Sequence, residues 1–412
     1  MSTVCIVIVD PYSSGATLAE SLRARGAECV AVISSQMLPE TMRTRFDPEQ
    51  FREVIQHDGQ LEMTANAIRR HQPMSVIAGF ESGVELAEQL SVNLGLPGNG
   101  TSKPTARRDK FIMTKAVHES GLRTAHQLLS RDVKEMLSWI RESVGWPVIV
   151  KPVDSVASDC VFCCHCDDQV RHAAETILST ASVLGIQNEK VLVQEFLAGV
   201  EYAVDTVSYD GQRKLTAIWQ YDRPTDAEDF ICYDAMRLLP YDGDRQRTLR
   251  DFAFAALDAL EIRFGPAHCE LMWVDGEPCF IEVGARLSAG VNATISRTCG
   301  GICQLDETVD AILAPDRFLA SLNDQLSLAK LAANVFLIPP RKGRLIRTRG
   351  LDELRRLPTL HSMSVASEPG TELAHVAGLV TLIDADENAI EQDMDVIRSL
   401  ERAGMFEVEE RT

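Results

Sequence analysis

Apolar strand-type runs that alternate with helical segments constrain the fold of this chain more than any other feature. An apolar run from Val4 to Val9 precedes a turn-rich loop, a helical segment over Ala16 to Arg25 and a second strand-type run over Glu28 to Ile33. The pattern repeats at Ser75 to Ala78, which a helical segment over Glu81 to Asn93 follows. This alternation predicts an N-terminal lobe built around a parallel sheet.

The loop after the first strand argues against one common use of such a lobe. It spans Asp10 to Gly15 and lacks the GxGxxG pattern that brings a backbone against a pyrophosphate. A dinucleotide-dependent dehydrogenase is therefore not expected.

Size and charge narrow the function classes further. With 412 residues the chain is too long for one ordinary core, which predicts a multidomain, enzyme-sized protein. A net charge of -19 disfavours nucleic acid as a partner, because binding a phosphate backbone needs clustered Lys and Arg. The first apolar run has no basic segment before it, and no later stretch approaches a membrane span. We therefore expect neither a signal peptide nor a membrane partner.

The chain has eleven cysteines, which we interpret as reduced thiols of a cytoplasmic protein. The densest group is Cys160, Cys163, Cys164 and Cys166 around His165, and thiolates with an imidazole are the preferred ligands of zinc. However, no second CxxC pair follows, and Val161-Phe162 is typical of a strand. We favour small cysteines in a sheet over a zinc site.

A second unit is predicted from about residue 98. A helical segment over Asp109 to Ser120 ends at Gly121, and a buried strand over Trp146 to Val150 delivers Lys151. Further predicted elements are a strand over Val191 to Gln194, an amphipathic helix over Thr248 to Leu260, two strands over His268 to Val274 and Cys279 to Val283, and a final helix over Glu387 to Glu401. We expect three domains, over 1–97, 98–325 and 326–412, with a lid subdomain at about 125–200.

Two carboxylates, Glu270 and Glu282, lie on the two arms of the predicted hairpin. Hard oxygen ligands of this kind suit Mg²⁺ that is shared with substrate phosphates. A two-residue Asp275-Gly276 loop would pair residue 270 with 281 and place the carboxylates on opposite faces, whereas a loop of three or five residues would pair 270 with 282. We predict the odd-length loop, which puts the two Cβ atoms ~5 Å apart. Considered alone, they could equally be two unrelated edge carboxylates.

Two lysines are candidates for phosphate binding. Lys110 opens a predicted helix, and Lys151 follows an apolar strand, at a strand end where ligands collect in α/β folds. Gln194-Glu195-Phe196-Leu197 ends another strand in a form that suits reading an adenine edge through the backbone. Each feature alone is also typical of a surface lysine or an ordinary strand end.

The order and spacing of these features resemble those of the ATP-grasp superfamily over about residues 98 to 315. The matching motifs are Arg107-Arg108-Asp109-Lys110, Val148-Ile149-Val150-Lys151-Pro152, Gln194-Glu195-Phe196-Leu197-Ala198-Gly199-Val200-Glu201, Gly265-Pro266-Ala267-His268-Cys269-Glu270 and Ile281-Glu282-Val283-Gly284-Ala285-Arg286. The resemblance implies an α/β protein of the ATP-grasp fold. Such a protein has an N-terminal Rossmann-like lobe, central ATP-grasp subdomains and a C-terminal α+β closing lobe.

The resemblance also implies a role for each matching residue. Lys110 and Lys151 match the lysines that hold the α- and β-phosphates of ATP. Glu195, Phe196 and Leu197 match the adenine hinge. Glu201 matches the acid that accepts hydrogen bonds from the ribose hydroxyls. Glu270 and Glu282 match the ligands of Mg²⁺, or of Mn²⁺ in its place. Arg286 matches the arginine that holds the transferring phosphate or the acyl phosphate, where a planar donor fork suits paired oxygens.

This sequence departs from the superfamily pattern in two places. The phosphate-covering loop over residues 154–159 has no glycine, so hydroxyls such as those of Ser155 and Ser158 would replace part of the usual backbone nest. Gly284 stands where many relatives carry a metal-binding asparagine, which bears on whether one or two metal ions bind.

Within the superfamily, Gly265 to Glu270, Gly284 to Gly290 and the loop over 155–159 most resemble the L-amino acid ligases. That branch implies an acyl phosphate, release of ADP and phosphate, and a dipeptide made from two small-molecule amino acids; it also allows a homodimer. The expected amino acid pocket comprises Tyr221, Tyr233, Met236, His268 and Gly290, although the stretch from Trp219 to Arg237 is equally compatible with a mobile acidic loop. The alternatives are another ATP-grasp ligase, biotin-carboxylase-like or nucleotide-biosynthetic, and a non-catalytic ATP-binding regulatory module.

Overall fold

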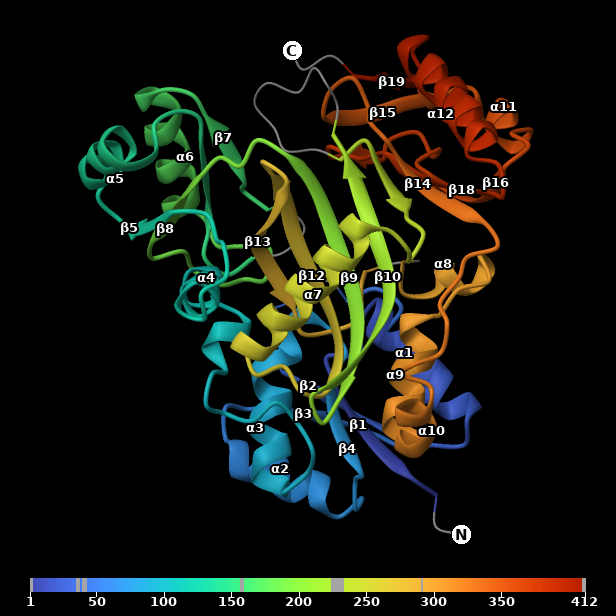
Figure 1. The fold of residues 1–412 in the computed structure, drawn as a ribbon. Coiled ribbons are helices and arrows are strands. Elements are labelled where there is room, and N and C mark those ends of the chain that lie inside the picture. Colours follow the sequence, from blue (N-terminus) through green and yellow to red (C-terminus); the bar gives the residue numbers. More distant parts are fainter. Residues whose placement is uncertain are drawn as a thin grey trace.

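The computed structural model describes residues 3–34, 38, 43–155, 159–223, 233–289 and 292–409 (Figure 1). Within them, no helix is long and apolar enough to cross a membrane.

The N-terminal lobe is a four-stranded parallel sheet with helices, as predicted. Its strand order is β3-β2-β1-β4, and β1 lies parallel to both β2 and β4. The strands are β1 (Cys5–Val9), β2 (Glu28–Ile33), β3 (Glu53–Gln56) and β4 (Ser75–Ala78), and the helices are α1 (Ser14–Ala24), α2 (Leu61–Arg69) and α3 (Val84–Leu94). Every residue of β1 is buried, because it is the inner strand of a sheet with apolar side chains on both faces.

A small antiparallel sheet follows in the chain, with strand order β5-β8-β6-β7. Its strands are β5 (Gln127–Ser130), β6 (Val148–Pro152), β7 (Phe162–Cys164) and β8 (Val191–Glu195), and the helices α5 (Val133–Trp139) and α6 (Asp167–Ser179) pack against it. Cys163 and Cys164 belong to β7, which confirms the predicted strand, and Cys164 is buried. Lys151 lies inside β6 rather than after it, because the strand begins and ends two residues later than predicted.

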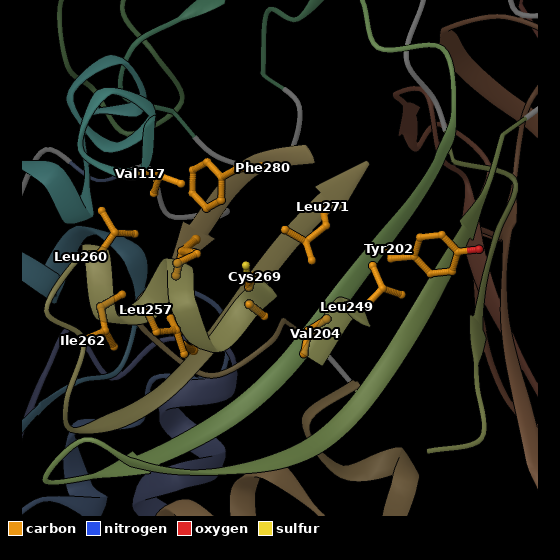
Figure 2. Packing of buried hydrophobic residues seen from close by; sticks show 14 of the residues in the cluster. Val117, Tyr202, Val204, Leu249, Leu257, Leu260, Ile262, Cys269, Leu271 and Phe280 are labelled. Carbon is orange, nitrogen blue, oxygen red and sulfur yellow. The ribbon is translucent and has the colours of Figure 1, made fainter. Parts of the chain in front are cut away.

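The largest sheet has eight strands in the order β13-β12-β9-β10-β11-β14-β18-β16. Its strands are β9 (Val200–Tyr209), β10 (Gln212–Asp222), β11 (Ala235–Leu238), β12 (Gly265–Val274), β13 (Glu277–Gly284), β14 (Leu331–Leu337), β16 (Leu360–Val365) and β18 (Gly378–Asp384). Helices α4 (Lys110–Glu119) and α7 (Asp244–Ala259) cover its β12–β13 end. Figure 2 shows this packing, with Leu257 of α7 and Cys269 of β12 in one buried cluster.

Three C-terminal strands, β14, β16 and β18, therefore extend the central sheet. Beside them lies a three-stranded sheet of β17 (Glu372–Leu373), β15 (Gly343–Thr348) and β19 (Phe406–Val408), with α11 (Leu351–Arg355) and α12 (Glu387–Arg402). Three further helices, α8 (Asn292–Thr298), α9 (Gln304–Leu313) and α10 (Pro315–Ala320), connect the hairpin to β14, and α9 packs on α1 of the N-terminal lobe.

Candidate active site

A cavity of about 210 Å³ lies where the small sheet, the β12–β13 hairpin and the N-terminal lobe meet. It brings together most of the residues predicted from the sequence: Lys110, Lys151, Ser155, Glu195, Phe196, Leu197, Glu201, Tyr233, Glu270, Glu282 and Arg286. Ser158 and Gly290 lie outside the described residues. Tyr221, Met236 and His268 are buried next to the cavity but do not line it.

Glu270 and Glu282 lie directly opposite each other on β12 and β13, as predicted, but the predicted reason is wrong. The loop has two residues, because Val274 pairs with Glu277 across Asp275 and Gly276. Asp275 and Gly276 have φ angles of 55° and 87°, as a type I′ turn requires. The register shifts at a β-bulge, where Ile281 is the extra residue between the pairs 271–280 and 270–282. The β-bulge, and not the length of the loop, therefore places both carboxylates opposite each other on the same face of the hairpin.

Each carboxylate has a cationic neighbour. Lys110 Nζ lies 3.1 Å from Glu282 Oε2, and His268 Nε2 lies 3.3 Å from Glu270 Oε1. Burial opposes ionisation of Glu270, but the hydrogen bond and charge of His268, with the charges of Lys110 and Arg286, outweigh it and lower its pKa. Burial likewise disfavours the Lys110 ammonium, but Glu282 and Glu81 raise the pKa of Lys110 above its usual value. Both groups are therefore charged near neutral pH.

The two facing carboxylates fit a divalent cation that shares its coordination with a substrate. The described residues contain no group of three or more His, Cys, Asp or Glu side chains that could hold a metal ion by themselves. Mg²⁺ is commonly bound by one or two carboxylates together with substrate phosphates and water, and this donor set matches that description.

Two lysines reach the cavity from different elements. Lys110 is the first residue of α4, whose N-cap Asp109 accepts a hydrogen bond from the Ile112 N–H, and its Nζ donates to the Ser155 carbonyl at 2.8 Å. Lys151 is only 6% exposed, and burial with the charge of Lys110 lowers its pKa although Glu282 opposes this shift. An ammonium that is desolvated in this way gains strongly from an anionic ligand.

The predicted adenine hinge follows β8. The Glu195 N–H donates to the His126 carbonyl at 2.9 Å, so this amide is already used, and the Glu195 carboxylate accepts from the His126 N–H. Apolar side chains that sequence reasoning missed complete this part of the cavity: Met113, Ala125, Ile149, Met272 and Ile281. They come from five separate elements or loops, so no local pattern could have shown them.

Glu201, the predicted ribose acid, is buried and already has partners. It forms an ion pair with Arg223 and accepts a hydrogen bond of 3.0 Å from the Tyr233 hydroxyl. Burial raises the pKa of Glu201 although Arg223 opposes the shift. Sequence reasoning did not identify Arg223, which also lines the cavity.

Four of the residues predicted for the amino acid pocket form one cluster, in which Tyr221, Met236 and His268 are buried and Tyr233 is half-buried. The rings of Tyr221 and Tyr233 lie 4.6 Å apart, and Met236 is opposite Tyr221 in the β10–β11 pairing. The Tyr221 hydroxyl lies 3.3 Å from His268 Nε2. In this group only Tyr233 lines the cavity.

His268 is held by a carboxylate on the neighbouring strand. Its Nδ1 lies 2.6 Å from Asp205 Oδ1, and Asp205 Oδ2 accepts a hydrogen bond of 2.9 Å from Trp219 Nε1. Burial lowers the pKa of His268, but Asp205 and Glu270 outweigh it and raise the pKa to about 10. A cationic His268 therefore sits between two carboxylates, one of them a candidate metal ligand.

Arg286 follows β13 and points back over the strand end. Its Nε lies 2.8 Å from Glu81 Oε2, and its Nη1 donates to the Leu287 carbonyl at 3.0 Å. Glu81 and its second partner Arg108 also line the cavity, and sequence reasoning gave neither a role there.

Comparison with known proteins agrees with this geometry. Residues 144–295 match the family model of the ATP-grasp domain. The chain carries an ATP-grasp domain. Dapdiamide A synthase of Enterobacter agglomerans is 29% identical over 408 residues, which cover 96% of this chain and 95% of that protein.

Solved structures share the ATP-grasp fold over the whole chain. The L-amino acid ligase from Bacillus licheniformis aligns with a TM-score of 0.75 at 15% identity and covers 100% of this chain and 99% of that one. The N5-carboxyaminoimidazole synthetase from Staphylococcus aureus complexed with ADP aligns with a TM-score of 0.66 at 15% identity, covering 96% and 97%. The predicted fold class is confirmed. The matched ATP-grasp segment contains Lys151, the hinge, both facing carboxylates and Arg286, whereas Lys110 and Glu81 precede it.

Proposed function

We propose that this chain is an ATP-dependent ligase that joins the carboxyl group of one L-amino acid to the amine of another through an acyl phosphate. The observation that carries the proposal is the facing pair Glu270 and Glu282 in one cavity with Lys110, Lys151 and Arg286. Three cations and a metal-binding pair suit a triphosphate and a phosphoryl group in transfer.

Each part of the cavity has a role in this proposal. Lys110 and Lys151 hold the α- and β-phosphates, the hinge over 195–197 with its apolar surroundings binds adenine, and Glu201 accepts from the ribose hydroxyls. Mg²⁺ held by Glu270 and Glu282 would neutralise charge between the β- and γ-phosphates. Binding of ribose would require Glu201 to exchange Arg223 or Tyr233 for the sugar.

The reaction has two steps. A carboxylate oxygen of the first amino acid attacks the γ-phosphorus, the bond to the β–γ bridging oxygen breaks, and ADP leaves. The amine of the second amino acid then attacks the acyl carbon, loses a proton, and displaces inorganic phosphate. In this proposal Arg286, which lines the cavity, binds the phosphoryl oxygens in both steps. Among the described residues that line the cavity there is no cysteine or histidine, and the route requires no covalent enzyme intermediate.

Two comparisons favour amino acids as substrates. Dapdiamide A synthase is similar to this chain over nearly the whole of both sequences, and the L-amino acid ligase shares its complete fold. The cluster of Tyr221, Tyr233, Met236 and His268 lies next to the metal-binding pair and would form one wall of the amino acid site.

A screen of paired amino acids tests the proposal. The chain is incubated with ATP, Mg²⁺ and each pair of the twenty amino acids, and phosphate release and product masses are measured. We expect ADP, phosphate and a dipeptide in equal amounts, with none of them formed by a Glu282→Gln preparation purified in parallel. AMP with pyrophosphate would contradict the phosphoryl-transfer route. Formation of an amide other than a dipeptide would contradict the assignment of amino acids as both substrates. Binding of ATP without turnover of any amino acid pair would favour a non-catalytic module.

A further inference from the structure

One carboxylate of the N-terminal lobe reaches into the cavity. Glu81 begins the 3₁₀ turn Glu81–Gly83, separated from the end of β4 by two residues and therefore at the carboxyl edge of the parallel sheet. Among the described residues before position 97, it alone lines the cavity, and it is 7% exposed. The phosphate and metal roles proposed above do not use it.

Glu81 joins two arginines that come from different parts of the chain. Its Oε2 lies 2.8 Å from Arg286 Nε, and its Oε1 lies 2.8 Å from Arg108 Nη1. Burial opposes ionisation of Glu81, but the charges of Arg286, Arg108 and Lys110 outweigh it and lower its pKa. A buried, ionised carboxylate with one arginine on each oxygen is held firmly, because losing either partner would leave a buried charge uncompensated.

The guanidinium of Arg286 is fixed on three sides. Nε is held by Glu81, and Nη1 is held by the Leu287 carbonyl. Its flat face packs on Gly284, where an added Cβ would lie 3.0 Å from Cζ and 3.1 Å from each Nη. Nη2 takes part in neither the ion pair with Glu81 nor the hydrogen bond to Leu287, so it remains a donor for the oxygens of a transferring group.

The second arginine leads to the loop expected to cover the phosphates. Arg108 forms an ion pair with Asp154, which opens that loop, as well as with Glu81. Arg286, Glu81, Arg108 and Asp154 thus form a continuous chain of ion pairs from the reacting end of the cavity to the base of the loop.

We propose that Glu81 is a positioning residue for the reaction, which orients Arg286 toward the transferring phosphoryl group and ties it through Arg108 to the base of the phosphate-covering loop. The kinetic part of this inference rests on the proposed function, whereas the orientation of Arg286 does not. Because Glu81 acts through a guanidinium that holds the reacting group, its loss should slow turnover more than it weakens nucleotide binding. A misplacement of about 1 Å in such a group can cost on the order of 100-fold in rate.

Glu81→Gln keeps the size of the side chain and removes its charge. We expect kcat for amide formation to fall about 10- to 100-fold, with the Kd for ATP within about threefold of wild type because the lysines and the hinge are intact. In an Arg286→Lys background, the same substitution should cause little further loss, since residues that act through one another are not additive. Full additivity of the two changes would show that Glu81 does not act through Arg286 and would overturn the proposal.

Glu88→Gln is the matched control. Glu88 lies on α3 of the same lobe, and its Oε1 is 2.6 Å from Arg107 Nε, so it also joins the lobe to the neighbouring arginine. Neither Glu88 nor Arg107 lines the cavity. We expect a lower melting temperature but an unchanged kcat in this variant. An equal fall of kcat in Glu81→Gln and Glu88→Gln would assign both effects to lobe docking and reject the positioning role.

Two further measurements keep the inference testable if Glu81→Gln folds poorly or if the substrates differ. Gly284→Ala removes no charged group but pushes the Arg286 guanidinium by a few tenths of an ångström. We therefore expect kcat to fall several-fold while ATP affinity is retained. A wild-type kcat in this variant would show that the exact position of Arg286 does not matter. Crystal structures of wild type and Glu81→Gln with ADP read the orientation without any turnover. An Arg286 side chain in the same place in both would overturn the proposal, whereas absence of turnover in wild type would count against the proposed function alone.

Discussion

Glu270 and Glu282 face each other across β12 and β13 because Ile281 bulges out of the ladder between them. With a regular ladder after the two-residue turn, Ile281 would lie opposite Glu270, and Glu282 would point to the other face of the sheet. One apolar residue therefore decides whether the two carboxylates lie on the same face of the hairpin. β-bulges are frequent next to active sites, where they redirect a side chain.

The facing carboxylates lead to the first prediction. Glu270→Gln and Glu282→Gln remove charge without changing size, so each should weaken Mn²⁺ binding in the presence of ADP by at least the ~10- to 100-fold typical of losing an outer-shell partner. Electron paramagnetic resonance of free Mn²⁺ measures this directly. Glu277→Gln, an exposed change at the start of β13, is the control and should bind Mn²⁺ like wild type. Wild-type affinity in both site variants would remove the metal assignment.

The buried Lys151 gives a second prediction about ATP affinity. Lys151→Met should weaken ATP binding by about 1.5 to 3 kcal/mol, because a charge-assisted contact is lost. Calorimetry with ADP, the expected product, measures the affinity for the nucleotide phosphates without any turnover. If both proteins bind the nucleotide equally, Lys151 has a structural role only.

The pKa of Lys151 gives a third prediction. Burial lowers it, with a contribution from the charge of Lys110, so the ammonium of the free protein is lost at a lower pH than that of an ordinary lysine. ATP binds the protonated form, so its Kd should rise as the pH increases, starting below the usual lysine range. Lys151→Arg stays protonated at any accessible pH, and its Kd should not rise in that window. Identical pH profiles for the two proteins would contradict the direction of this shift.

Asp205 supports a fourth prediction. Asp205→Asn removes the charge that keeps His268 cationic, so His268 should titrate at lower pH and donate less well to Glu270. We expect about 10- to 100-fold weaker Mn²⁺ binding, as is typical when a residue that supports a metal ligand from outside the coordination sphere is lost. Asp258→Asn, an exposed carboxylate paired with Arg213, is the control. Unaltered Mn²⁺ affinity in Asp205→Asn would show that the pair with His268 only stabilises the fold.

Short-range patterns in the sequence predicted the elements that carry the site. The strand Ser75–Ala78 has the predicted bounds, and the strand of Lys151 and the two arms of the hairpin are present with shifted ends. These elements combine apolar runs with turn residues at their ends, so the local sequence determines both their hydrophobic periodicity and where they begin and end.

The features that the sequence did not predict depend on tertiary context. Ile281 is an apolar residue in an apolar strand, and nothing in its neighbours distinguishes a bulge from a regular position. Glu81 reads as an ordinary acidic residue at a helix start, because its partner Arg286 lies in a distant part of the chain. The one local hint is that Glu81 comes shortly after a strand of a parallel sheet, at the edge where ligands collect.

The last prediction concerns the path of one oxygen atom. If the carboxylate of the first amino acid attacks the γ-phosphorus, the attacking oxygen becomes the bridge of the acyl phosphate and leaves with the phosphate when the amine displaces it. A donor labelled with ¹⁸O in both carboxyl oxygens should therefore place one labelled oxygen in each inorganic phosphate released and leave the other in the amide. The facing carboxylates are suited to a metal between the β- and γ-phosphates, so the nucleotide product should be ADP. Mass spectrometry of the phosphate, with unlabelled donor in labelled water as the control, distinguishes this transfer from hydrolysis of ATP. Unlabelled phosphate that accompanies amide formation, or AMP in place of ADP, would reject the acyl-phosphate route.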